Sequence, residues 1–290
     1  MGVYEISLAT VVGINIIQTL GLNMISGFCG QISLGHAAFV GVGAYTTAMT
    51  AKAGLPLPAA LLAGVLMAGL IGVLVGLASL RVRDDFLAIT TMGVGFLFLG
   101  IVRQQELLGG ELGVSGIPAH GLDSVGFLIM ILMLAALVMA ISLYIRRSWM
   151  GFAFEAVAED EDTARVLSVD VASYKLAAFA MGTAMAGLAG GLYAYYARFI
   201  MPDDFGFTAS ITMLSMVAVG GIGSVYGVLA STVLLTLMPE FFRFMSDYKL
   251  LIYAALLFSV MRFAPEGLAG LVRNLAEFIS RKNTPAEVAS

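Results

Sequence analysis

The side chains that could do chemistry are few in this chain, and they lie far apart in the sequence. There are two histidines, His36 and His120, and one cysteine, Cys29, which lies in an apolar stretch. Nucleophilic and metal-dependent catalysis both need several such groups held close together. Because the sequence shows no grouping of this kind, it indicates no enzyme, no metal site and no bound cofactor.

Two features that would supply energy for transport are also missing. The long apolar stretches contain no Asp or Glu, although a carboxylate often couples transport to protons or sodium. The phosphate-binding sequence G-x-x-x-x-G-K-[ST] does not occur either. If the chain takes part in active transport, the energy must therefore enter through another polypeptide.

Acidic residues gather instead in the polar segment 146–175, which separates two apolar stretches. Residues 155–167 are expected to form a short helix, in which Glu161 precedes Arg165 by four positions and can pair with it. Two interpretations stay open. The segment is either a solvated loop with a charged face, or a helix that docks a cytosolic partner and passes its movement into the membrane.

Polar and glycine residues interrupt two apolar stretches, at 27–35 and at 220–224. Irregular backbone at membrane depth is tolerated where protein or a watery cavity satisfies it, so both breaks are candidates to line a pathway. Helix ends at two breaks would suit a zwitterionic amino acid, because they offer opposite partial charges. The candidate pathway residues are Gln31, Ser33, His36, Thr90, Thr91, Gly220, Gly221 and Gly223.

Each of these candidates has a structural alternative. The first break can be a cytoplasmic turn in which His36 caps a helix. Thr90 and Thr91 can return hydrogen bonds to their own helix. Polar residues of the first apolar stretch, such as Asn15 and Asn23, more often bridge helices than bind substrate.

Composition shows that the elements holding these residues must be membrane-spanning helices. Hydrophobic residues make up 60% of the chain and charged residues 12%, about half the roughly 25% of an average soluble protein. The mean hydropathy of +0.96 agrees. Since the formal net charge is −4 and no Lys/Arg-rich run occurs, nucleic-acid binding has no electrostatic basis.

The predicted fold is all-α: a polytopic transmembrane bundle of eight or nine spans, some of them short or broken. A helix needs about 20 apolar residues to cross the bilayer core. Residues 1–263 form the predicted membrane domain and 264–290 a cytoplasmic tail. The charge-poor candidate spans are 6–26, 36–53, 53–80, 86–102, 124–145, 176–197, 205–239 with its interruption, and 250–261.

Lys and Arg fix the expected orientation, because they are enriched on the cytoplasmic side. With nine spans and segment 146–175 inside, most of them lie on that side and the N-terminus lies outside. The first apolar stretch is expected to be retained, since residues 1–5 hold no positive charge. Asp-Asp-Phe at 84–86 and again at 203–205, on opposite sides, suggests an inverted repeat.

Five sequence strings, taken together and in order, carry a family resemblance. They are GFCGQISLGHAAFVGVGAY (27–45), RVRDDFLAITT (81–91), EAVAEDEDTARVLSVDVASYKLAAFAMGTAMAGLAGGLYA (155–194), MVAVGGIGSVYG (216–227) and FAPEGLAGL (263–271). The chain resembles the permease subunits of branched-chain amino-acid ABC importers, of the LivM/LivH type, and is closer to LivM.

The resemblance implies a multi-pass permease in the lipid of the bacterial inner membrane. It implies a second, LivH-like permease that encloses one pathway with this chain. Two ATP-binding subunits and an extracytoplasmic solute-binding protein complete the complex, and the substrate is leucine, isoleucine, valine or a related small molecule. The residues to which the resemblance gives the ATPase-coupling role are Glu155, Ala156, Glu159, Asp160, Glu161 and Asp162.

Two positions depart from the family pattern. Ala158 stands where family members commonly carry Arg, and in the loop 109–118 Leu112 replaces a usual Asn. Contacts with the ATPase and with the binding protein through these two side chains are therefore in question.

Two other functions compete with the importer. One is a related permease that carries urea or an amide, and the other is a passive channel for a small neutral solute. A channel needs no acidic cytoplasmic helix, so solute flux through vesicles that hold this chain alone would distinguish it.

Overall fold

The computed structural model describes residues 2–79 and 84–241, together with Leu251, Ala255, Phe258, Arg262, Gly267 and Gly270. Nearly all of the predicted last span, 250–261, and of the predicted tail, 264–290, lies outside these residues. The long helices are α1 (Val3–Leu22), α2 (His36–Lys52), α3 (Leu57–Ser79), α4 (Asp84–Gln104), α5 (Ser124–Arg147), α8 (Val171–Ala197), α9 (Phe207–Gly220) and α10 (Val225–Phe241).

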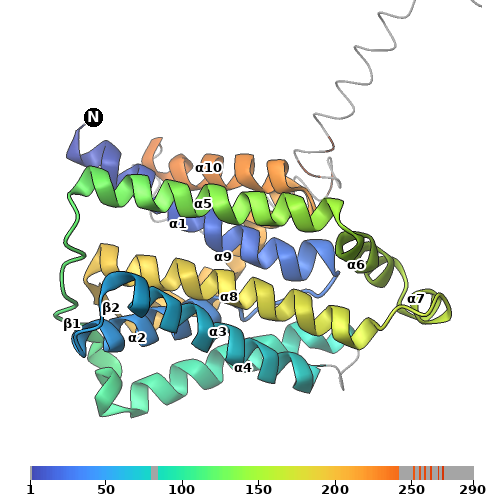
Figure 1. The fold of residues 1–290 in the computed structure, drawn as a ribbon, viewed down its shortest axis with the longest axis horizontal. Coiled ribbons are helices and arrows are strands. Elements are labelled where there is room, and N and C mark those ends of the chain that lie inside the picture. The colour runs from blue at the N-terminus through green and yellow to red at the C-terminus, as the bar shows by residue number, and fades with distance from the viewer. Residues whose placement is uncertain are drawn as a thin grey trace, which may run out of the picture.

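Shorter elements connect these helices. They are the π-helix η1 (Asn23–Phe28), the 3₁₀ turns η2 (Glu106–Leu108), η3 (Gly110–Leu112) and η4 (Pro202–Phe205), the helices α6 (Trp149–Glu159) and α7 (Glu161–Val166), and the strands β1 (Val114–Ser115) and β2 (Phe199–Ile200). The long helices lie side by side, α6 and α7 stand at one end of the bundle, and the antiparallel pair β1–β2 stands at the opposite end (Figure 1).

Within the described ranges, five helices are long and apolar enough to cross a membrane, and α10 contains a shorter apolar helix. The five are Val3–Phe28, Leu57–Ala78, Phe86–Gln104, Ser124–Arg147 and Val171–Ala197. The helices α2 and α9 have 17 and 14 residues. At about 1.5 Å per residue they are shorter than a bilayer core of roughly 30 Å.

Both predicted interruptions are confirmed. α1 continues into η1, residues 29–35 are not helical, and α2 begins at His36. The second interruption separates α9 from α10, and it contains Gly221 and Gly223 with φ of +103° and +81°. Glycine adopts this left-handed backbone without the steric cost that a Cβ would add.

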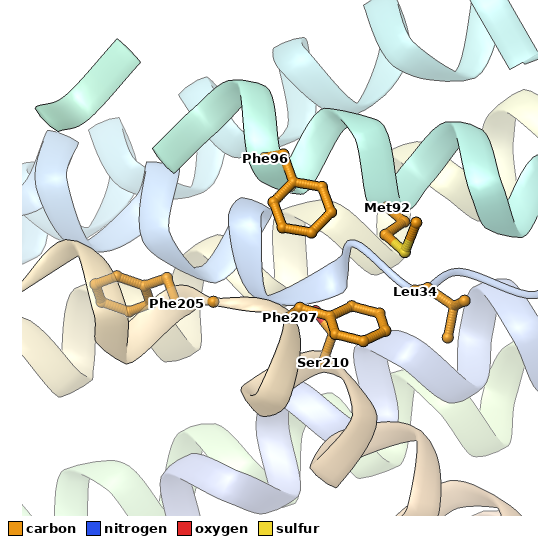
Figure 2. A pocket seen from close by; sticks show the side chains of 8 residues that line it. Leu34, Met92, Phe96, Phe205, Phe207 and Ser210 are labelled. Carbon is orange, nitrogen blue, oxygen red and sulfur yellow. The ribbon is translucent and has the colours of Figure 1, made fainter. Parts of the chain in front are cut away.

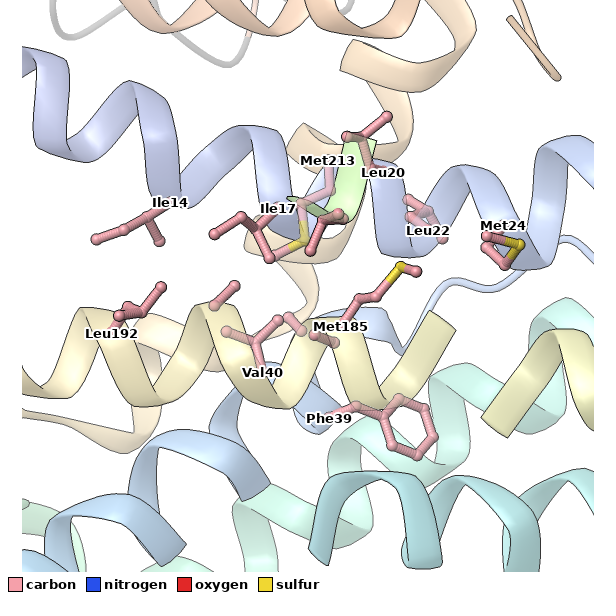
Figure 3. Packing of buried hydrophobic residues seen from close by; sticks show 14 of the residues in the cluster. Ile14, Ile17, Leu20, Leu22, Met24, Phe39, Val40, Met185, Leu192 and Met213 are labelled. Carbon is pink, nitrogen blue, oxygen red and sulfur yellow. The ribbon is translucent and has the colours of Figure 1, made fainter. Parts of the chain in front are cut away.

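The centre of the bundle is α8, which packs against α1, α2 and α3. Small residues allow this, because a Cβ on Gly187 would lie 2.5 Å from the Cβ of Ala68 and 2.7 Å from the carbonyl oxygen of Gly64 in α3. Such close backbone approach is how helices associate where lipid removes the hydrophobic driving force. Figure 3 shows the apolar layer in which Ile14 and Ile17 of α1 face Met185 and Leu192 of α8.

The expectation of one helix over 155–167 is wrong, because the segment holds parts of two helices. α6 ends at Glu159, Asp160 takes an extended backbone with φ of −161°, and α7 begins at Glu161. The Asp160 carboxylate accepts a hydrogen bond of 2.7 Å from the Thr163 N–H, which caps α7. An acidic run favours a new helix start over continuation, since its side chains can cap free N–H groups and suit the positive end of the helix dipole.

The packing of α8 gives a stability prediction. Gly187→Ala places a methyl group inside the contact with α3, so we expect about 1–3 kcal/mol of destabilisation and a lower thermal unfolding midpoint of the detergent-solubilised chain. Gly100→Ala in α4 is the control, because nothing lies within 4 Å of its added Cβ. That variant should be neutral or gain up to about 1 kcal/mol. Equal midpoints for the two variants would contradict the packing.

Candidate functional site

The first break is held by side chains that replace the missing helical hydrogen bonds. The hydroxyl of Ser26 donates to the Gln31 carbonyl oxygen at 2.9 Å and accepts from the Ser33 N–H at 3.4 Å. The Leu34 N–H donates to the Thr91 hydroxyl at 3.0 Å. Because each bond comes from a fixed partner on η1 or α4, the irregular backbone of residues 29–35 is kept in one conformation.

The predicted residues Gln31, Ser33 and His36 are all buried at this break, with 2%, 0% and 0% of their surface exposed. His36 lies at the start of α2, with its Nε2 3.2 Å from the Gln18 carbonyl oxygen. Gln31 Oε1, Ser33 Oγ and His36 Nδ1 have no hydrogen-bond partner among the described residues. Buried polar atoms are rarely left unpaired, so these three can receive a polar ligand or water.

The second break meets the first. The Gly223 N–H donates a 2.9 Å hydrogen bond to Asn23 Oδ1 of η1, and a Cβ added to Gly27 would lie only 2.6 Å from the same nitrogen. Asn23 therefore bridges η1 and the second break, in line with the bridging role that the sequence favours for it. The sequence does not predict that Asn23 joins the two breaks. The one sequence feature that points to this role is an amide side chain four residues before Gly27.

Thr90 and Thr91 have different surroundings. The partly exposed Thr90 donates only to the Phe86 carbonyl oxygen of its own helix, at 3.0 Å. The buried Thr91 donates to the Ala88 carbonyl oxygen and also accepts the Leu34 N–H. Of the two, Thr91 alone ties α4 to the first break.

A small crevice lies where α2 and α9 begin, beside α4. Figure 2 shows Met92 and Phe96 of α4 and Phe207 and Ser210 of α9 around it. The Ser210 hydroxyl accepts a 3.0 Å hydrogen bond from the Ala37 N–H, so α9 caps the first turn of α2. These lining residues were not predicted: Leu34, Met92, Gly95, Phe96, Phe205, Gly206, Phe207 and Ser210.

The six residues predicted to couple to the ATPase differ in their exposure and contacts. Glu155, Glu159 and Asp162 are exposed, whereas Ala156 packs against the core. Glu161 forms ion pairs with Arg165 at 2.9 Å and with Lys175 of α8. The sixth, Asp160, is the α7 cap described above. Exposed carboxylates can meet a partner, while Glu161 fixes α7 to the bundle.

The Asp160 cap persists at neutral pH. The Thr163 N–H stabilises the charged carboxylate and holds the pKa of Asp160 below its ordinary value. Because this pKa is lowered by folding, the cap contributes fully above the ordinary value and is lost only as the pH falls through the lowered one.

Apolar side chains are also exposed on this segment. Trp149 and Phe152 of α6 are 81% and 61% exposed, and Val166 and Leu167 at the tip of α7 are 82% and 68% exposed. Exposed apolar side chains close in sequence to exposed acids suit contact with another protein or with the membrane surface.

At the opposite end of the bundle, polar contacts join the ends of α2 and α4 to β1 and η4. Arg103 and Asp203 form an ion pair at 2.5 Å, and Lys52 Nζ donates to the Ser115 carbonyl oxygen at 3.1 Å. Leu112, the departure noted in the sequence, is 84% exposed. Among the described residues, no group of three or more His, Cys, Asp or Glu side chains is placed to hold a metal ion.

Apolar helices that are interrupted within the bundle, with unpaired buried polar atoms at the interruption, are typical of membrane transport proteins. A family model described as the permease component of the branched-chain amino acid transport system matches residues 5–261. The chain belongs to this family. It is a LivM-like permease component of an ABC transport system, a multi-pass membrane subunit that is not itself an enzyme.

Individual relatives agree with the family. The high-affinity branched-chain amino acid transport system permease protein LivM of Escherichia coli (strain K12) is 32% identical over 299 residues, which cover 92% of this chain and 70% of LivM. LivH of the same strain is 31% identical over 134 residues, covering 46% of this chain and 43% of LivH. The autoinducer 2 import system permease protein LsrC of Yersinia enterocolitica is 26% identical over 237 residues, covering 76% and 63%. No solved structure matches the chain.

The contrast between the two threonines is testable. Thr91→Val leaves the Leu34 N–H without its acceptor, which costs about 1–3 kcal/mol and loosens the first break. We expect a lower unfolding midpoint and weaker substrate uptake by the assembled transporter, with Thr91→Ser close to wild type. Thr90→Val, the matched control, should change neither measurement. Equal losses for Thr90→Val and Thr91→Val would contradict the role of Thr91.

Proposed function

We propose that this chain forms one half of a pathway that carries branched-chain amino acids across the bacterial inner membrane. A second, LivH-like permease supplies the other half. Two ATP-binding subunits supply the energy, a solute-binding protein delivers the substrate from outside, and the permease itself binds no cofactor. Family membership and the branched-chain amino acid transport function of LivM support the substrate class. The observation that carries the pathway is the meeting of the two helix breaks through Asn23 and Gly223.

The first break has the chemistry to contact the polar end of an amino acid. Ser33 Oγ can donate to a carboxylate, and Gln31 Oε1 can accept from an ammonium group. Both atoms are buried and have no partner among the described residues. The start of α2 beside them carries the positive end of a helix dipole, which also favours the carboxylate.

The α6–α7 segment supports docking of the ATP-binding subunits. It offers exposed acids, Glu155, Glu159 and Asp162, beside the exposed apolar tip of Val166 and Leu167. The ion pair between Glu161 and Lys175 ties the segment to α8, the central helix. Force applied to the tip would therefore reach the core of the bundle.

The element order also supports the proposed topology of eight or nine spans with an inverted repeat. A long helix, an irregular stretch and a short helix follow one another in α1, 29–35 and α2, and again in α8, 198–206 and α9. α1 and α8 run in opposite directions (Figure 1). This register pairs α2 with α9, whereas the Asp-Asp-Phe match would pair α4 with α9. The order of elements therefore favours a different register from the three-residue match.

Reconstitution tests the function as a whole. Vesicles that hold both permeases, the two ATP-binding subunits and the external binding protein should accumulate labelled leucine only with ATP. Urea and a simple amide are added as competitors of leucine, because a permease for urea or an amide is the alternative interpretation. ATP-independent flux through vesicles that hold this chain alone would instead make it a passive channel.

The substrate contacts give a sharper prediction. Ser33→Ala and Gln31→Ala each remove one hydrogen bond worth about 0.5–1.5 kcal/mol, so leucine uptake by the complex should fall roughly two- to tenfold. Ser142→Ala is the matched control, because this buried hydroxyl donates to the Val138 carbonyl oxygen of its own helix. Unchanged uptake in both break variants would remove residues 29–35 from the pathway.

A further inference from the structure

η1, the second break and the residue Gly267 approach one another closely at the end of the bundle next to α6. Gly27 of η1 approaches the second break, where a Cβ on Gly223 would lie 3.0 Å from the Gly27 carbonyl oxygen. Gly267, which follows the second break in the sequence, also lies against it, since a Cβ on Gly267 would lie 2.6 Å from the Cα of Gly221. We call Gly27, Gly221, Gly223 and Gly267 the glycine junction.

The glycine junction leaves no room for side chains between its segments. Three of its members, Gly221, Gly223 and Gly267, have positive φ values. A substitution at any of the three would add strain, and a Cβ at Gly223 or Gly267 would also crowd the neighbouring backbone. Backbone packed this closely leaves no passage between these residues, and glycine has the conformational freedom to rearrange.

One side-chain hydrogen bond crosses the glycine junction among the described residues, from the Gly223 N–H to Asn23 Oδ1. Asn23 is 1% exposed, and the Cβ position of Gly27 overlaps its Oδ1, so only glycine at 27 leaves space for this amide. Asn23 Nδ2 makes no hydrogen bond in the described structure. The acceptor oxygen of Asn23 therefore supplies the contact.

The helix α6 of the α6–α7 segment touches this region directly. Gly30 has a φ of +73°, and a Cβ there would lie 3.1 Å from the Cα and 3.2 Å from the Cβ of Ala158 in α6. Gly30 lies three residues after Gly27. A displacement of α6 would therefore press on the first break beside the glycine junction.

We propose that the glycine junction is the inner gate of the pathway, latched by the Asn23–Gly223 hydrogen bond and moved by α6 through Gly30. This proposal rests on the proposed function, because it needs a pathway and an ATPase that moves α6. Asn23 acts as a positioning residue that holds the second break closed, and it does not contact substrate.

The test compares two variants of nearly the same shape in the reconstituted four-subunit complex. Asn23→Leu removes the acceptor, whereas Asn23→Asp keeps an oxygen in its place. Without ATP, vesicles preloaded with labelled leucine should lose it roughly two- to tenfold faster with Asn23→Leu, the range that follows from one hydrogen bond. Asn23→Asp should restore slow efflux. Thr212→Val is the control, because this hydroxyl donates to the Thr208 carbonyl oxygen of its own helix.

A second variant tests the proposal if the complex with Asn23→Leu does not assemble. Gly30→Ala adds a methyl group against Ala158, so the number of leucines moved per ATP hydrolysed should fall while ATP hydrolysis continues. The latch is contradicted if assembled Asn23→Leu leaks no faster than wild type, or if Asn23→Asp leaks equally. Wild-type coupling in Gly30→Ala contradicts the link to α6. A wild-type complex that accumulates no leucine with ATP refutes the proposed function instead.

Discussion

Helix breaks inside a bilayer must find hydrogen bonds within the protein, and this constraint organises the whole molecule. No water in the hydrocarbon core can satisfy a free N–H or carbonyl group. The chain meets the requirement with a few side chains: Ser26 and Thr91 at the first break, Asn23 at the second, and Ser210 at the start of α2. The breaks keep their conformation because these partners are fixed by the surrounding helices.

Close helix packing puts those partners within reach. Gly187 lets α8 approach α3, and Gly35 lies against the backbone of Thr91 in α4, so the first break contacts α4 directly. Each partner of a break is therefore also part of the packing between helices. A movement of α6, which touches Gly30, would be passed on through contacts that have little room to yield.

Much of this arrangement could be predicted from the sequence. A charge-free stretch too long for one helix, with glycines at 27, 30 and 35, located the first break, and the run at 220–223 located the second. The expectation of one continuous helix over 155–167 failed at Asp160, because this residue ends one helix and its side chain caps the next. Pairings such as Asn23 with Gly223 and Ala37 with Ser210 were out of reach, because they join residues 200 and 173 positions apart. Periodicity reports which face of a helix is buried, but it does not report which distant residue covers it.

The central claim is that residues 29–35 line the route of the substrate, and cysteine accessibility tests it most directly. Cys29 is the sole cysteine of the chain, so Ser33→Cys in a Cys29→Ala background gives one reactive site. In the reconstituted complex, a small water-soluble maleimide should label Cys at 33 during ATP turnover, and leucine should slow the labelling. Labelling that never occurs, or that proceeds at the same rate with and without leucine, would contradict a pathway at this break.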